Sequence, residues 1–477
     1  MYKNPSYFIF LLLLGIVVWQ CNPDEDLPEI VEPEEPIVLE VEKGEELSGG
    51  QATVFDVSEN AFGFQAPGLS NQNQLLFFVG NSFFNQNWVT APASTTARDG
   101  LGPFFNARSC ASCHFKDGRG EPLVGEKTQR GKGLLLRISV PGVSRYGGPL
   151  PEPTYGTQIS DRSIDGIESE AHFIINYKEQ PGQYPDGETY SLRAPDYELM
   201  ETFYGDLDPQ VLISPRIAPQ MIGLGLLEAI DESSLLANAD EFDVDKDGIS
   251  GKPNYVWDFV HQQVSLGRFG WKANEPNLLQ QTAGAFLGDL GITSYLFSEE
   301  NCVEGLDCND IPNGGEKEID DHDLEKTVLY SSSLAVPARR DWEDETVLKG
   351  KQLFNKINCS SCHVPKYTTG QHHLFPAFSN QEIWPYTDLL LHDMGPGLAD
   401  NRPEFDATGR EWRTPPLWGI GLFPVVNDHS FYLHDGRARN LEEAILWHGG
   451  EAEASKKAFM TLTKEDRDAI IQFLNSL

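Results

Sequence analysis

Two copies of the motif Cys-x-x-Cys-His constrain what this 477-residue chain can fold into. They stand at residues 110–114 (CASCH) and 359–363 (CSSCH). This spacing is typical of c-type haem attachment, in which each thiol binds one vinyl group of the porphyrin and the adjacent histidine ligates the iron. The predicted attachment residues are Cys110, Cys113, Cys359 and Cys362, and the predicted iron ligands are His114 and His363.

Other uses of the two cysteine pairs fit less well. A zinc ribbon would place the pairs about 15–20 residues apart, whereas here they begin at 110 and 359 and are therefore 249 residues apart. A thioredoxin-like redox motif does not require the histidine, and the flanking segments lack a βαβ pattern. Two plain disulfides would leave both histidines unexplained. We therefore expect two covalently bound haem c groups.

The segments around the second motif have helical periodicity. Val347, Phe354 and Ile357 repeat at helical spacing just before the cysteines. The chain ends in LTKEDRDAIIQFLNSL (462–477), where Thr463 and Asp466 form a capping-box-like start and an apolar stripe follows. A helix before the motif and a closing helix are the arrangement of a cytochrome c domain. We expect a mainly α fold with two cytochrome c-like haem domains.

The chain divides by composition into four segments. We predict a signal peptide at 1–20, an acidic disordered tether at 21–50, an N-terminal haem c domain at 51–340 and a C-terminal cytochrome c domain at 341–477. Residues 115–215 are rich in Gly, Pro and Tyr and contain short alternating stretches, so the N-terminal domain is expected to be enlarged by loop and short-strand insertions.

A faint internal repeat links the two halves. The run RIAP (216–219) leads to GLGL (223–226), and RTPP (413–416) leads to GIGL (419–422). Each copy follows one haem motif, and the second is one residue shorter. The repeat indicates a duplicated cytochrome unit.

The N-terminus resembles an export signal. Lys3 precedes 12 apolar residues, Phe8 to Trp19, which are too few to span a bilayer but suit a secretory signal. Cys21 stands where a bacterial lipoprotein signal carries its lipidated cysteine; a short uncleaved signal anchor is the alternative. Residues 22–47 hold 11 carboxylates and one lysine, which indicates a solvated tether. We expect an extracytoplasmic protein, either periplasmic or an outer-membrane lipoprotein that could reach the cell surface.

The overall charge excludes some partners. Lys and Arg total 36 and Asp and Glu total 72, which gives a net charge of −36. Such an acidic chain is not suited to bind a nucleic-acid backbone or anionic lipid headgroups. We expect no nucleic-acid partner, and membrane contact only through the lipid anchor.

Two smaller sites are predicted between the motifs. Cys302 and Cys308 lack a following histidine and a nearby third ligand, so a disulfide is favoured over a metal site. The run DVDKDG (243–248) has carboxylates at positions 1, 3 and 5 of a calcium loop and glycine at 6, although position 12 is Asn254 rather than glutamate. Its predicted Ca²⁺ ligands are Asp243, Asp245 and Asp247; a solvated acidic turn is the alternative.

Longer segments resemble a known family. They include LGPFFNARSCASCHFKDGRG (101–120), SPRIAPQMIGLGLLEAI (214–230), EWRTPPLWGIG (411–421) and FYLHDGRARNLEEAILWHGGEA (431–452). These segments are similar to the di-haem oxidoreductases, described as peroxidases and sometimes labelled thiol oxidoreductases. More distantly, the chain resembles the bacterial di-haem cytochrome c peroxidases, in which one haem reacts with peroxide and the other relays electrons.

The resemblance implies a sixth ligand for the second haem. In the distant relatives a methionine or tyrosine on the helix after the HDG turn ligates the relay haem, and His448 holds that position here. This implies ligation by His363 and His448, and two imidazoles give a lower potential than His/Met. Met394, His392 and His434 are rival ligands, and His448 could instead be a surface histidine at a helix end.

The first haem departs from the relatives. They carry a capping histidine soon after the first motif, but here none lies between His114 and His172, so the iron is either open or capped by His172. Trp271 and Trp257 are candidates for a ring between the haems, or simply core residues. The catalytic candidates are Glu228, which could instead be a helix-end carboxylate, and Arg216.

We expect a peroxidase-like oxidoreductase that reduces peroxide at the first haem with electrons relayed through the second. A small redox protein, such as a cytochrome c or a copper protein, would be the donor. Two alternatives stay open. One is an electron-transfer cytochrome without catalysis, and the other is an enzyme that oxidises a protein or thiol substrate with high-valent haem.

Overall fold

The computed structural model describes residues 40–122, 133–372 and 374–477. Residues 39–477 form one compact unit. The predicted signal peptide and the predicted lipidation site Cys21 lie outside the described residues. Within the described residues, no helix has both the length and the apolar character needed to cross a membrane.

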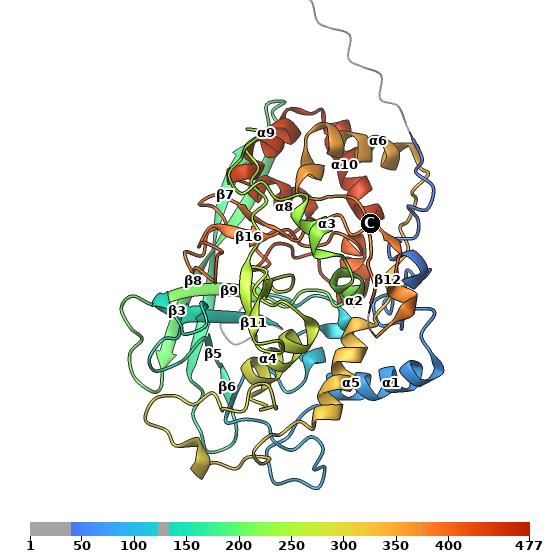
Figure 1. Ribbon diagram of the computed structural model, residues 1–477. Coiled ribbons are helices and arrows are strands. Elements are labelled where there is room, and N and C mark those ends of the chain that lie inside the picture. Colours follow the sequence, from blue (N-terminus) through green and yellow to red (C-terminus); the bar gives the residue numbers. More distant parts are fainter. Residues whose placement is uncertain (1–39, 123–132, 373) are drawn as a thin grey trace, which may run out of the picture. The chain divides into compact units, whose positions relative to one another are not determined.

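Helices and strands are interspersed along the chain (Figure 1). The α-helices are α1 Asn71–Asn85, α2 Leu224–Glu228, α3 Glu232–Leu236, α4 Leu278–Leu290, α5 Asp321–Ser332, α6 Glu345–Lys356, α7 Phe423–Asn427, α8 Leu441–Trp447, α9 Glu453–Thr461 and α10 Lys464–Ser476. The strands are β1 Thr53–Val54, β2 Phe104–Phe105, β3 Leu134–Val143, β4 Pro149–Leu150, β5 Gln158–Ile159, β6 Arg162–Ser163, β7 Ala171–Gln183, β8 Thr189–Thr202, β9 Leu212–Ile217, β10 Tyr255–Asp258, β11 Gln263–Leu266, β12 Val336–Pro337, β13 Tyr367–Thr368, β14 Glu382–Ile383, β15 Leu391–Asp393 and β16 Glu411–Arg413.

The prediction of a mainly α fold is wrong. The chain is 28% helical and 21% strand, so the fold is mixed, with many small sheets. Most of the extended structure comes from the insertion after the first motif. There β3 pairs with β4, β5 and β9, and β7 and β8 form a long antiparallel hairpin. The helical stripes near the cysteines gave no information about these strands.

Helices α6 and α10 cross closely beside the second motif. The side chain of Asp344 caps α6 and that of Thr463 caps α10. A Cβ on Gly350 would lie 2.0 Å from the carbonyl oxygen of Ala469, so only glycine allows this approach. The rings of Phe354 and Phe473 meet across the crossing at 5.2 Å. The two helices predicted near the second motif are therefore present.

Helices α1 and α5 repeat this crossing beside the first motif. A Cβ on Gly80 of α1 would lie 2.0 Å from the carbonyl oxygen of Lys326 in α5. Phe77 and Phe84 of α1 pack on Tyr330 of α5. Each half of the chain thus contains one tightly crossed helix pair, built around a glycine.

The sequence repeat has a structural counterpart. Gly223 and Gly419 both adopt a left-handed conformation, with φ of 69° and 73°. Their N–H groups donate to the carbonyl oxygens of Leu334 and Leu477, residues that follow α5 and α10. The same turn thus packs on the same helix end in each half, as expected for a duplicated unit.

The predicted tether is described only over its last residues, 40–50, and these pack onto the protein. The Glu45 side chain is fully buried, accepts a hydrogen bond from Lys351 at 2.7 Å and pairs with Arg339.

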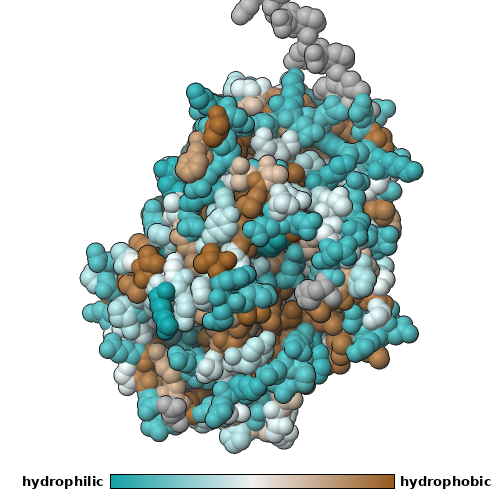
Figure 2. Space-filling view, in the orientation of Figure 1, coloured by the Kyte–Doolittle hydropathy of each residue, from teal (hydrophilic) through white to brown (hydrophobic). Residues whose placement is uncertain are grey.

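Figure 2 shows a largely hydrophilic face with scattered apolar residues, which agrees with the acidic composition.

Candidate functional site

The first motif forms a tight turn that aims its histidine. Cys110–Ser112 form a short 3₁₀ helix, and the N–H of His114 donates to the carbonyl of Cys110 at 2.9 Å. The Nδ1 of His114 donates to the carbonyl of Pro219 at 2.7 Å. Burial lowers the pKa of His114, which keeps the ring neutral. The fixed Nδ1 leaves Nε2 as the nitrogen that can ligate a metal.

The second motif repeats the geometry of the first. Cys359–Ser361 form the 3₁₀ turn directly after α6, and His363 donates from its N–H to the carbonyl of Cys359 at 3.0 Å. Its Nδ1 donates to the carbonyl of Tyr386 at 3.1 Å. Burial, reinforced by the nearby His448, lowers the pKa of His363 to about 4. Its Nε2 is therefore also available to a metal.

A large cavity opens at the second motif. The empty space in and in front of it, open solvent included, is about 1450 Å³. Its walls are mostly apolar, with a few polar groups, as in cofactor sites generally. The predicted site residues on its wall are Cys359, Cys362, His363, His448, Trp271, Met394, His392 and His434. The structure therefore brings both predicted ligands of the second haem to one cavity.

His448 has the same hydrogen-bond arrangement as the two motif histidines. It directly follows α8, and its Nδ1 donates to the carbonyl of Ala444 at 2.7 Å. Burial lowers its pKa, so the ring is neutral. A backbone-anchored Nδ1 and a neutral ring leave Nε2 able to bind iron. His448 is not the surface histidine of the alternative interpretation.

One of the rival ligands, His392, is engaged by two carboxylates. His392 contacts Asp388 through Nε2 at 2.8 Å and Glu451 through Nδ1 at 2.7 Å. Although burial opposes it, the charge of Asp388 raises the pKa of His392 well above its usual value, so its ring is an imidazolium. His434 is stacked on Trp412 with 3.8 Å between the ring centroids. Met394 and His434 both line the cavity and stay rivals.

Two buried arginines indicate that an anionic cofactor such as haem fits this cavity. Arg119 and Arg413 line it and are only 5% and 7% exposed. Within the described residues neither forms an ion pair, and the Nε of each has no hydrogen-bond partner. Burial lowers the pKa of both to about 10. Uncompensated buried cations cost several kcal/mol. The two propionates of a haem would neutralise this pair, so the residues present fit the group.

The two predicted inter-haem tryptophans lie in different places. Trp271 lines the cavity, donates from Nε1 to the carbonyl of Ile217 at 2.8 Å and lies 5.1 Å from the Arg119 guanidinium. Trp257 lies in β10 and stacks on Tyr146 at 5.2 Å. Of the two, only Trp271 is on the cavity wall. Both inter-haem roles stay predictions.

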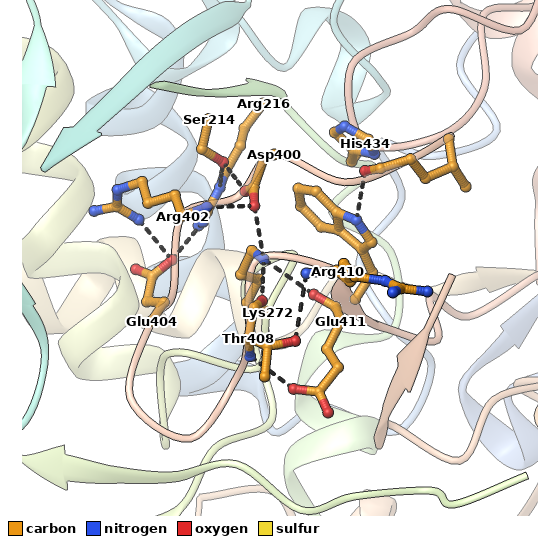
Figure 3. A network of polar contacts seen from close by, with 12 residues as sticks. Ser214, Arg216, Lys272, Asp400, Arg402, Glu404, Thr408, Arg410, Glu411 and His434 are labelled. Carbon is orange, nitrogen blue, oxygen red and sulfur yellow. Dashed lines mark hydrogen bonds and ion pairs between the residues drawn. The ribbon is translucent and has the colours of Figure 1, made fainter. Parts of the chain in front are cut away.

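Arg216 belongs to a buried charge network against the cavity (Figure 3). It pairs with Glu404, which Arg402 contacts at 3.0 Å. Beside them Lys272 contacts Asp400 at 3.1 Å, and both side chains are buried. The Lys272 ammonium lies 4.3 Å from the ring of Trp412, which lines the cavity. Arg216 is thus held by a carboxylate, and its catalytic role stays a prediction.

Glu228 and His172 lie in a helix and a strand, and both side chains contact other residues there. Glu228 ends α2, accepts from the N–H of Leu278 at the start of α4 at 2.8 Å and lies 3.8 Å from His372. His172 lies in β7 with its ring 5.4 Å from that of Phe203. Neither side chain is on the wall of the cavity at the second motif. Their roles as acid–base and as iron cap stay predictions.

Cys302 and Cys308 are joined by a disulfide, as predicted.

The carboxylates that converge in the acidic loop are not the three that were predicted as Ca²⁺ ligands. Carboxylate oxygens of Asp240, Asp243 and Asp245 lie within 4.8 Å of one another, and the side chain of Asp247 accepts from the N–H of Ile249. Asp240 was missed because it precedes the matched calcium pattern.

The acidic loop gives a prediction about calcium. Three converging carboxylates repel unless a cation neutralises them. We expect Ca²⁺ to raise the melting temperature and a chelator to lower it by a few degrees. Asp243→Asn should abolish this difference, while Asp247→Asn should preserve more of it. Identical melting with Ca²⁺ and with chelator would return the loop to a solvated turn.

Sequence reasoning missed three residues at the cavity. Arg119 stands in the matched segment after the first motif, yet it lines the cavity of the second. Arg413 was noted only as part of the repeat, and Trp412 beside it was not considered. The sequence does not show which arginines are buried or which of them lack a carboxylate partner, because both depend on the three-dimensional structure.

The comparisons with known proteins agree with the motifs. The sequence profile of a family described as "Di-haem oxidoreductase, putative peroxidase" matches residues 43–477. No curated protein matches the chain. A solved structure of Kuenenia stuttgartiensis hydrazine synthase, pressurized with 20 bar xenon, is similar over 87% of this chain and 94% of that chain, with 14% sequence identity and a TM-score of 0.31. At that TM-score the likeness carries no argument.

Proposed function

The chain belongs to the di-haem oxidoreductase family, and on that premise we propose an exported enzyme that carries two covalent haem c groups and reduces peroxide. His114 would hold the haem at which peroxide is reduced, and His363 and His448 would hold the haem through which electrons enter. The reaction takes two electrons and two protons per peroxide and releases two water molecules.

The observation that carries this proposal is the cavity at the second motif. It combines two neutral imidazoles whose Nδ1 atoms are anchored to backbone carbonyls, His363 and His448, with two buried arginines, Arg119 and Arg413, that form no ion pair within the described residues. Haem supplies the electron-transfer and peroxide chemistry when bound. The chain's own contribution is to orient the imidazoles, exclude water from the apolar walls and neutralise carboxylates.

A second candidate function is electron transfer without catalysis. The placement of the two catalytic candidates favours it. Oε1 of Glu228 accepts from the start of α4 and Arg216 pairs with Glu404, and these contacts would restrain both side chains from the acid–base and cation roles of a peroxidase. The third candidate, an enzyme that oxidises a protein or thiol substrate, is tested by measuring peroxide-dependent turnover with different electron donors.

Export and partners extend the proposal. Covalent haem attachment and the disulfide Cys302–Cys308 are suited to an oxidising, extracytoplasmic compartment. The N-terminal sequence supports lipidation at Cys21 and an outer-membrane or periplasmic location. The net charge of −36 favours a positively charged donor, because opposite charges speed the association of redox partners.

The test begins with the number of haems. Expressed with a haem-maturation system, the protein is expected to carry two covalent haems by mass spectrometry. Cys113→Ser and Cys362→Ser should each impair attachment at one site only. A count of zero or one in the parent protein would contradict the proposal.

Resting-state EPR then separates the two functions. The peroxidase predicts a high-spin ferric signal from the haem of His114 that peroxide changes, and peroxide-dependent oxidation of a reduced donor. Glu228→Gln should slow turnover without changing the melting temperature if this carboxylate moves a proton. A protein that is low-spin at both irons and inert to peroxide after partial reduction would favour the electron carrier.

A further inference from the structure

We propose that the β7–β8 hairpin is a clamp that positions His448 by holding α8 against the cavity. The inference rests on the ligation proposed above, in which His448 binds the second haem. The hairpin belongs to the insertion between the first motif and Arg216, yet it runs along the C-terminal part of the chain toward α8 and α9 (Figure 1). The N-terminal half of the protein therefore supports a ligand in the C-terminal half.

Helix α8 presents different faces to the cavity and to the hairpin. Leu441, Ala444, Ile445 and His448 line the cavity, and their spacing of three and four places them on one side of the helix. Glu442 lies outside this stripe. A helix of seven residues is too short to hold its own conformation, so the position of His448 depends on what fixes the other face.

The tip of the hairpin fixes that face. The Tyr184 hydroxyl donates to Oε1 of Glu442 at 2.6 Å. The guanidinium of Arg467 in α10 donates to Asp186 at 2.8 Å and to Glu188 at 2.6 Å, and it lies 3.9 Å from the centre of the Tyr184 ring. The Arg467 side chain is only 2% exposed. The tip is thus bound to both α8 and α10.

The stem of the hairpin fixes the chain that enters α8. Arg439 donates to Glu179 of β7 at 3.0 Å and to the carbonyl of Ser191 in β8 at 2.8 Å. Arg193 of β8 is buried and donates to the carbonyl of Arg437 at 2.9 Å. These charge-assisted bonds restrain the residues before α8, so the hairpin contacts both the helix and the chain that enters it.

The test measures how easily an external ligand replaces His448. Carbon monoxide is titrated into the ferrous full-length holoprotein, and binding is followed at the second haem. Replacing residues 182–190 with Asn-Gly closes the hairpin at the Pro181–Ser191 pair and removes the tip. We expect CO to bind the second haem about tenfold more tightly, which corresponds to 1.4 kcal/mol. Tyr184→Phe, which keeps the fold, should give about a threefold effect.

Two further variants make the test decisive. Lys178→Gln removes an exposed pair with Asp196 on the same hairpin and should leave CO binding unchanged. His448→Ala should open the second haem fully; if it does not, the ligation itself is wrong. If His448→Ala opens the haem but the two tip variants leave CO affinity unchanged, the clamp is wrong and the ligation stands. A lower melting temperature with unchanged CO affinity overturns the clamp too.

Discussion

Lys272→Met is expected to lower the free energy of unfolding by about 3–5 kcal/mol, the cost of leaving one buried charge without its partner. Lys272 is 0% exposed and Asp400, 3.1 Å away, is 1% exposed. The ammonium also donates to the carbonyl oxygens of Thr408 and Glu411, which would lose their donor. Urea unfolding of the haem-loaded protein measures the change.

Two control variants separate a buried charge from a general loss of packing. Lys272→Met/Asp400→Leu removes both charges and should restore most of the stability. Lys178→Met breaks a pair whose side chains are 74% and 55% exposed, and it should have no measurable effect. A double variant as unstable as the single one would show that the hydrogen bonds to the carbonyls, and not the charge, carry the cost.

The cysteine motifs and the helices near them were predictable because their signals are local. A Cys-x-x-Cys-His run needs no tertiary information, and the stripe from Val347 to Phe354 reports one helix face. The repeat was also visible in the sequence, since Gly223 and Gly419 must adopt left-handed conformations.

The β7–β8 hairpin was not predictable in the same way. Its strands are 13 and 14 residues long, and each contains proline and charged residues that weaken a strand pattern. They are stabilised by partners far along the chain, such as Arg437 and Arg439. Long-range partners leave no periodicity in the sequence, so the fold class was misjudged.

The difference between local and long-range signals also explains which site residues could be predicted. His448 was found because a resemblance placed it after an HDG turn. The engagement of Arg216 by Glu404, 188 residues away, could not be read from either segment. Candidate site residues are recognised from the sequence by their chemistry, but tertiary contacts decide whether their side chains are available.

His448→Ala is expected to convert the second haem from low-spin to high-spin in the resting ferric protein. The ring lines the cavity and is anchored through Nδ1 to the carbonyl of Ala444, so its removal should leave the sixth position open unless Met394 or His434 on the same wall replaces it. The loss of one imidazole should also raise the reduction potential of this haem, because nitrogen ligation favours ferric iron. EPR and spectroelectrochemical titration measure the two effects, and the signals of the first haem should stay nearly unchanged.

Imidazole rescue tests whether the lost ring was the ligand. Added imidazole should fill the space left in His448→Ala and restore the low-spin signal, whereas it should have little effect on the parent protein. Met394→Leu is the matched variant, since Met394 lines the same cavity and is the rival sixth ligand. If Met394→Leu gives the high-spin signal and His448→Ala does not, the thioether is the ligand. The potential should then fall in Met394→Leu, because a thioether favours ferrous iron.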